Sequence, residues 1–148
     1  MFNNLLLKDV LSSDVSGTVN VVSFVDKLLE LSLEQNASDI HIEPVEEQTR
    51  VRLRIDGLLY TVVEVPRSNH NAIVSRIKII SGMDIAEKRL PQDGRVDLVV
   101  SGRKVDLRIA TIPVVEGEKL VIRLLDKGQQ LKTLASLDFT EANLEIYR

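Results

Sequence analysis

The sequence of 148 residues contains no cysteine and no tryptophan, and only 3% of its residues are aromatic. The absence of cysteine excludes disulfide bonds, thiolate zinc sites and a cysteine nucleophile, and it fits a reducing compartment. So few aromatic side chains disfavour a stacking platform for single-stranded nucleic acid. No apolar run approaches the roughly 20 residues of a membrane-spanning helix, and no signal peptide is evident. We therefore expect a soluble, cytoplasmic protein.

Positive charge is scarce in the first third of the chain. Residues 1–48 contain nine acidic side chains and two lysines, whereas residues 49–148 contain seventeen basic and thirteen acidic ones. The net charge of −3 is far from the strongly basic balance of nucleic-acid-binding domains, so we expect no nucleic acid among the partners. Every arginine lies after residue 49, which indicates specific roles for arginine in the second part.

The spacing of apolar residues changes along the chain and predicts an α+β fold. A period near 3.6 predicts two helices, at residues 20–36 and 69–82, with Asn20 and Ser68 as N-terminal caps. A period of two predicts about six strands, at residues 39–44, 49–55, 58–65, 95–100, 103–111 and 118–126. Asp56-Gly57 predicts a tight hairpin, and residues 89–95 are typical of a turn. Short connections between strands predict a mostly antiparallel sheet with the helices on one face.

The same patterns divide the chain into three segments. Residues 1–17 show no clear period, and we interpret them as a flexible lead-in. Residues 18–126 are expected to form one domain of ordinary size. Residues 127–148 begin as a linker and continue into a helix from Thr140, which indicates a fragment of a longer protein.

The strand "ASDIHIEP" raises the question of a metal site, because its alternation places Asp39, His41 and Glu43 on one face. A metal site needs ligands from several elements, and the only other histidine, His70, lies between two asparagines. The alternative is a half-buried strand whose polar row pairs with the basic row of the next strand, Arg50, Arg52 and Arg54. The residues favour this second interpretation, so we expect no metal.

Two arginines stand out in the later strands. Arg108 follows Asp106 on the polar face of "VDLRIAT", and Arg123 is a lone charge on a largely apolar face of "KLVIRLLD". A guanidinium that loses its water must pair with an acid or meet an anion. From the residues alone, a cross-strand ion pair with Asp97 or Asp106 is the favoured interpretation, and anion binding is the alternative.

Four phrases together carry a family resemblance: "ASDIHIEP", "RLRIDG", "RIKIISGMDIAEKRLPQDGR" and "VDLRIATIPVVEGEKLVIRLLDK". Their order and spacing resemble the ATPases of bacterial type II secretion and type IV pilus assembly, from Val21 to the C-terminus. The resemblance implies a PAS-like domain that precedes a RecA-like ATPase core in a hexamer. It also implies ATP and Mg²⁺ as cofactors, and partners among inner-membrane platform proteins at the cytoplasmic face of the inner membrane.

The chain departs from that family because it contains no G-x-x-x-x-G-K-[ST] phosphate loop. The family's acidic magnesium motif and four-cysteine zinc motif are also missing. We therefore expect this chain alone to have no catalytic residues and no ATPase activity. It resembles the domain that precedes the core.

The resemblance changes the interpretation of the arginines. In this family, arginines in the matching strands reach the phosphates of ATP held by the neighbouring core, and they correspond to Arg108 and Arg123. Arg95 is a further candidate, which either contacts phosphate or pairs with Asp93 or Asp97 near its turn.

Two functions follow from these patterns. The first is a non-catalytic domain that supplies arginines to ATP on the adjacent core and couples hydrolysis to domain movement. The alternative is a stand-alone PAS-like binding or adaptor module, which would need a sizeable internal pocket. Glu116 and Glu118 flank Gly117 in a predicted loop, and we interpret both as solvated turn residues rather than as paired catalytic carboxylates.

Overall fold

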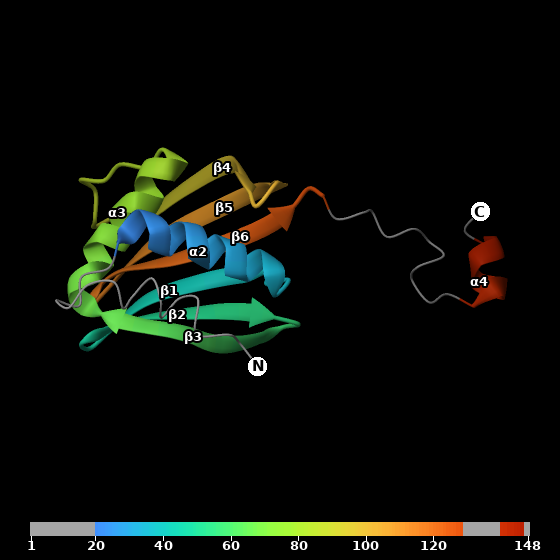
Figure 1. The fold of residues 1–148 in the computed structure, drawn as a ribbon, viewed down its shortest axis with the longest axis horizontal. Helices are drawn as coiled ribbons and strands as arrows, with labels where there is room; N and C mark the ends of the chain where they lie inside the picture. The colour runs from blue at the N-terminus through green and yellow to red at the C-terminus, as the bar shows by residue number, and fades with distance from the viewer. Residues whose placement is uncertain (1–19, 129–139, 147–148) are drawn as a thin grey trace.

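The computed structural model describes residues 20–128 and 140–146 and contains one six-stranded sheet with the order β3-β2-β1-β6-β5-β4 (Figure 1). Neighbouring strands of this sheet are all antiparallel. The strands are β1 (Asp39–Val45), β2 (Gln48–Ile55), β3 (Leu58–Pro66), β4 (Gln92–Val100), β5 (Arg103–Val114) and β6 (Gly117–Asp126). The helices are α2 (Val21–Glu34), the 3-10 helix η1 (Arg67–Asn69), α3 (His70–Ser81) and α4 (Glu141–Ile146). The predicted lead-in and most of the predicted linker lie outside the described residues.

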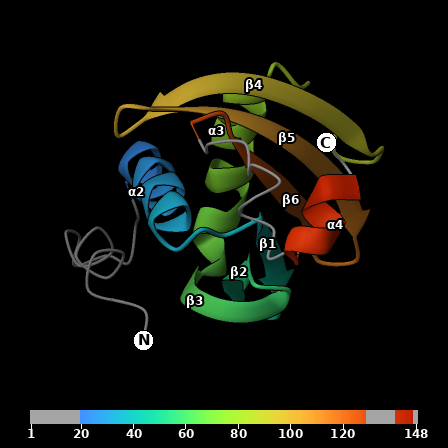
Figure 2. The same cartoon turned by 90° about the vertical axis from the view of Figure 1, so that its right-hand side faces the viewer.

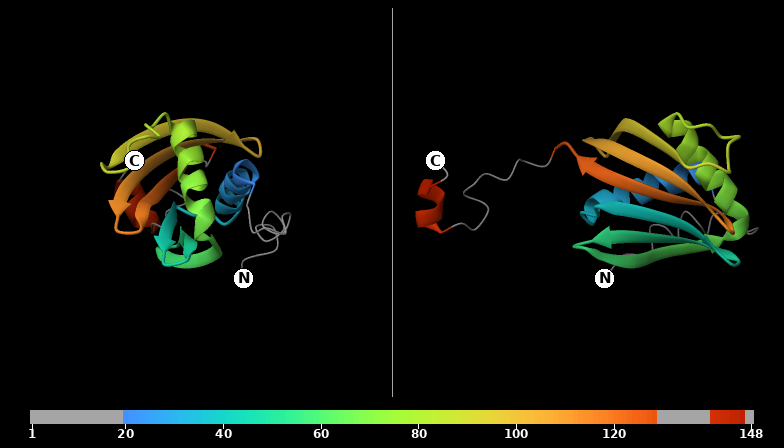
Figure 3. Two further views of the ribbon diagram at one scale, coloured as in Figure 1. Left: turned by 90° about the vertical axis from the view of Figure 1, so that its left-hand side faces the viewer. Right: turned by 180° about the vertical axis from the view of Figure 1, so that it is seen from behind.

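Helices α2 and α3 cover one face of the sheet, which curves around them (Figures 2 and 3). The core lies between these layers and includes Phe24 and Leu28 of α2, Ile73 and Ile77 of α3, and Ile40 of β1, all at most 1% exposed. The predicted α+β, PAS-like arrangement is confirmed. None of the helices among the described residues is both long and apolar enough to cross a membrane.

Local sequence signals set the ends of α2. Asn20 Oδ1 accepts a hydrogen bond from Ser23 N at 3.1 Å, which confirms the predicted cap. After the helix, Asn36 adopts a φ of 53°, a left-handed conformation that asparagine tolerates and that turns the chain toward β1. The predicted cap at Ser68 is wrong, because Ser68 lies inside η1 and α3 begins at His70 without a capping side-chain bond.

The Asp56-Gly57 hairpin is confirmed. Asp56 has a φ of 50° and Gly57 a φ of 82°, so both central residues are left-handed, and Ile55 of β2 pairs with Leu58 of β3. This turn matches the right-handed twist of the two strands. It sets the register of β2, whose odd-numbered residues face the core and whose arginines face outward.

The prediction of a turn over residues 89–95 is wrong in its second half, because β4 begins at Gln92 and pairs with β5 from there. Gly94 therefore serves as a strand residue rather than as a flexible turn residue. A Cβ atom at Gly94 would lie 2.7 Å from Met83 Cε and 3.0 Å from Ser81 O. The missing side chain lets the end of α3 pack against the edge strand.

Candidate functional site

Glu43 on β1 pairs with a neighbouring arginine, as predicted. Its Oε1 accepts a hydrogen bond from Arg52 Nη2 at 2.6 Å and lies 3.2 Å from Lys119 Nζ. Burial by itself would raise the pKa of Glu43, but the hydrogen bonds from these two cations outweigh it, so the pKa is lowered. This carboxylate is ionised and already neutralised from both neighbouring strands.

His41 lies on the same face of β1 without a hydrogen bond at Nδ1, which is 3.9 Å from Glu43 Oε1. Burial and, next, the charge of Lys119 lower the pKa of His41, so its ring is neutral at pH 7. Within residues 20–128 and 140–146, no group of three or more His, Cys, Asp or Glu could hold a metal ion. The polar row of this strand instead makes ion pairs with β2 and β6.

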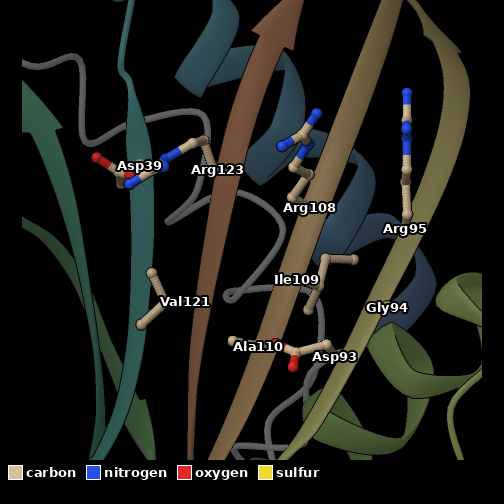
Figure 4. A pocket seen from close by; sticks show the side chains of 9 residues that line it. All are labelled: Asp39, Asp93, Gly94, Arg95, Arg108, Ile109, Ala110, Val121 and Arg123. Carbon is tan, nitrogen blue, oxygen red and sulfur yellow. The ribbon is translucent and has the colours of Figure 1, made fainter.

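The strand register aligns five outward-facing side chains across the sheet, which we call the arginine row: Arg54, Asp39, Arg123, Arg108 and Arg95. They come from β2, β1, β6, β5 and β4 in that order, and Figure 4 shows the last four side by side. Neighbouring strands lie ~4.8 Å apart. The row therefore gathers four guanidinium groups and one carboxylate on the face without helices.

Arg123 is paired, but with a different acid from those predicted. Its Nε donates to Asp39 Oδ1 at 3.3 Å, and Figure 4 shows its side chain directed toward Asp39. The predicted partners are occupied elsewhere, because Asp106 binds another arginine and Asp97 binds Lys127. The side chain of Arg123 is 67% exposed, so the single contact leaves most of the guanidinium accessible.

Arg95 is the most firmly held member of the arginine row. Its Nε donates to Asp106 Oδ1 at 3.0 Å, and its Nη2 donates to Asp106 Oδ2 at 2.6 Å. This two-point geometry is the strong form of an arginine–carboxylate pair, and Asp106 is only 3% exposed. The predicted partners Asp93 and Asp97 are wrong, because Asp106 on the neighbouring strand β5 is the acid that Arg95 reaches.

Arg108 is exposed and has no hydrogen-bond or ion-pair partner within the described part of the chain. It faces Arg123 on one side and Arg95 on the other. Figure 4 shows its guanidinium between theirs without reaching either. A cation placed opposite two like charges, with no acid of its own, is suited to bind an anion that comes from outside this chain.

A depression of about 650 Å³ lies along the arginine row. Its lining includes the small or short side chains Gly94, Ala110 and Val121 beside the arginines (Figure 4). Ala110 pairs with Val121 across β5 and β6, so no bulky side chain fills the space beside Arg108. A phosphate group approaching the open face of the sheet would meet the guanidinium groups of Arg95, Arg108 and Arg123, and beside them the carboxylates of Asp39 and Asp93.

A buried polar network on the helix side was missed by the sequence analysis. Lys78 Nζ donates to Glu118 Oε1 at 2.8 Å and to Glu87 O at 2.6 Å, and Lys78 is only 1% exposed. His70 Nε2 lies 2.7 Å from Glu118 O, and its Nδ1 lies 3.0 Å from Thr49 Oγ1. The interpretation of Glu118 as a solvated turn residue is therefore wrong, because this carboxylate is inside the fold.

The sequence matches the family described as Type II/IV secretion system protein over residues 14–148. The chain belongs to this family. It is 50% identical over 114 residues to the Type II secretion system protein HxcR of Pseudomonas aeruginosa, covering 77% of this chain and 24% of that protein. It is 46% identical over 120 residues to the Type IV pilus assembly ATPase PilB of Myxococcus xanthus, covering 80% of this chain and 21% of that one.

Among solved structures, the Legionella pneumophila ATPase DotB has a similar fold, with a TM-score of 0.64 and 18% sequence identity. The match covers 93% of this chain and 37% of DotB. The chain thus spans about a quarter of the length of each of these two curated relatives. Membership of the predicted family is confirmed, and the chain has a fold similar to that of the DotB ATPase.

Proposed function

We propose that this chain is the non-catalytic domain of a hexameric, ATP-driven motor for type II secretion or type IV pilus assembly. Arg108 and Arg123 contact the phosphates of ATP bound by an adjacent RecA-like core. Arg95 is a third candidate, but its two-point bond to Asp106 leaves less of its charge for a phosphate. The observation that carries the proposal is the arginine row on the face that α2 and α3 leave open, with Arg108 unpaired among the residues that the structure describes.

The chemistry of phosphate recognition supports this assignment. A guanidinium presents several N–H donors in a plane and binds phosphate oxygens at two points. Arginines that neutralise charge on the phosphoryl group during transfer contribute several powers of ten in rate. ATP with its Mg²⁺ would supply the phosphoanhydride bond, and Arg108 and Arg123 would stabilise the negative charge on its phosphate oxygens.

The names of the relatives support a motor for secretion or pilus assembly. One is named a secretion protein and another a pilus assembly ATPase, and this chain covers about a quarter of each. A domain that contributes arginines without its own phosphate loop would move toward the core when nucleotide binds. Because the motor uses ATP, we place it in the cytoplasm, docked to platform proteins at the inner membrane.

The test uses the full-length protein with Arg108→Ala and Arg123→Ala introduced separately. We expect each change to lower the ATP turnover number about a hundredfold or more, since arginines of this kind contribute about 10³–10⁵-fold. The matched control is Arg50→Ala, which removes another outward arginine of the same sheet, paired with Glu64 at 2.8 Å. Its turnover should equal that of the unmodified protein.

Unchanged turnover in both Arg108→Ala and Arg123→Ala would overturn the supply of arginines to ATP, whereas a full-length protein without any ATP turnover would favour the stand-alone adaptor. The packed interior offers that alternative little support. Phe24, Ile73 and Leu107, which meet between the helices and the sheet, are fully buried. A ligand sensor would require a cavity in this region.

A further inference from the structure

Asp39 is the one acid of the arginine row, and the register places it between Arg54 and Arg123. Its side chain is 12% exposed, whereas that of Arg123 is 67% exposed. The carboxylate thus lies at the level of the sheet while the guanidinium it holds extends toward solvent.

The contacts of Asp39 fix its own orientation. Its Oδ2 accepts a hydrogen bond from Ser38 Oγ at 2.9 Å and lies 3.7 Å from Arg54 Nε. Its Oδ1 is left for Arg123 Nε, at 3.3 Å. The two carboxylate oxygens therefore have separate contacts, and Oδ1 faces Arg123.

We propose that Asp39 is a positioning residue for Arg123. Because it binds the guanidinium at Nε, it leaves both terminal nitrogens of Arg123, which have no partner in the described part of the chain, to contact an anion. It also offsets part of the repulsion that Arg123 experiences from Arg108, which faces it directly across β6 and β5. This inference rests on the proposed function, since it requires that Arg123 contacts phosphate.

Glu43 provides an internal comparison on the same strand. It also bridges cations of both neighbouring strands, Arg52 and Lys119, and its side chain is 14% exposed. None of these three residues belongs to the arginine row. Glu43→Ala therefore removes a similarly buried carboxylate that bridges cations of both neighbouring strands but does not contact Arg123.

The experiment is a double-mutant cycle in the full-length protein, with ATP turnover measured for Asp39→Ala, Arg123→Ala and the double variant. We expect Asp39→Ala to lower kcat about tenfold or more, because a misplaced group costs up to about 10² in rate. The double variant should match Arg123→Ala within about twofold, since the two residues act through one contact. Asp39→Asn keeps the acceptor oxygen and should recover part of the loss.

Two further readouts separate positioning from simple loss of stability. Asp39→Ala should lower kcat by a larger factor than it raises the KM for ATP, because Arg123 acts on charge that develops during phosphoryl transfer. Glu43→Ala should leave kcat within about twofold of the unmodified protein, as expected for a change independent of Arg123. If Glu43→Ala lowers kcat as much as Asp39→Ala does, the positioning role is overturned.

The remaining outcomes are also decisive. Full additivity of Asp39→Ala and Arg123→Ala, or a kcat for Asp39→Ala that is unchanged or raised, would overturn the positioning role while the proposed function stands. A raised kcat would show that Asp39 competes with phosphate for Arg123. Unchanged turnover in Arg123→Ala would instead remove the proposed role of that arginine itself, and the inference with it.

Discussion

Arg108 and Arg123 face each other directly across β5 and β6, yet within residues 20–128 and 140–146 only Arg123 of the two has an acidic partner, Asp39. Two cations in direct cross-strand register destabilise a sheet. Other arginines on the same outer face are paired with acids, as Arg50 is with Glu64. A like-charge pair that lowers stability is typical of a site that serves function rather than stability.

The first prediction follows from that repulsion. Replacing Arg108 with glutamine should raise the free energy of unfolding of the 148-residue chain by about 0.2–1 kcal/mol, the usual contribution of a cross-strand pair to stability. The gain should shrink in high salt, since the charges are exposed and screened. Urea unfolding at low and high salt measures both effects. Arg50→Gln is the control, and it should show no gain because it breaks a pair with Glu64. A destabilised Arg108→Gln would contradict the repulsion.

Strand patterns made most of the fold predictable. Val51 and Leu53 alternate with arginines, and both are fully buried. The inward and outward faces of β2 could therefore be predicted from the sequence. Asp56 and Gly57 specified a turn whose two central residues must adopt a positive φ, which these residue types tolerate. These signals are local, since each depends on a few neighbouring residues.

The partners within the site could not be predicted, because they depend on strand order. Asp39 and Arg123 are 84 residues apart in sequence and meet only because β1 lies beside β6. Asp106 on β5 lies diagonally from both Arg95 and Arg123 in the register, and it pairs with Arg95. Residue patterns indicated that these arginines needed anions, but no local signal indicated which acids lie beside them.

The buried pair of Lys78 and Glu118 gives a second prediction. Lys78→Met should destabilise the chain by about 3–5 kcal/mol, because Glu118 would remain buried without its cation. The double variant Lys78→Met/Glu118→Leu should be destabilised by less than Lys78→Met alone, since it leaves no unpaired charge. Chemical denaturation of the three proteins gives the comparison. A double variant that is the least stable would show that the ion pair itself stabilises the fold.

The contact between β4 and the end of α3 gives a third prediction. Gly94→Ala should lower the free energy of unfolding by about 1–3 kcal/mol, the usual cost of overpacking. The added Cβ would meet Met83 Cε at 2.7 Å, and Ser81 Cβ and Ser81 O at 3.0 Å. Adding Met83→Ala should recover only part of this loss, because the contact with the backbone oxygen of Ser81 remains. Thermal unfolding measures both, and full stability in Gly94→Ala would refute the close packing.

The fourth prediction concerns pH and rests on His70, which is 2% exposed. Burial is the main cause that lowers the pKa of His70 below its ordinary value of 6.5. Below that pH the unfolded chain therefore binds a proton that the folded chain excludes. Stability should fall as the pH drops from 6.5 toward 5, by up to about 1.4 kcal/mol per pH unit for each such histidine. His41, whose pKa is also lowered by burial, should add to the slope.

Urea unfolding at intervals between pH 7.5 and 5 tests this slope, because this pH range separates the contribution of the histidines to stability from that of the carboxylates. The pKa of Glu43 is held below its ordinary value of 4.5, so its contribution to stability is lost only in more acid solution. His70→Asn will lower stability at every pH, because it removes contacts with Thr49 and Glu118. Its profile should nevertheless be flatter between pH 6.5 and 5 than that of the unmodified chain. A parallel profile would show that His70 binds its proton equally well in both states, and the burial argument would then fail.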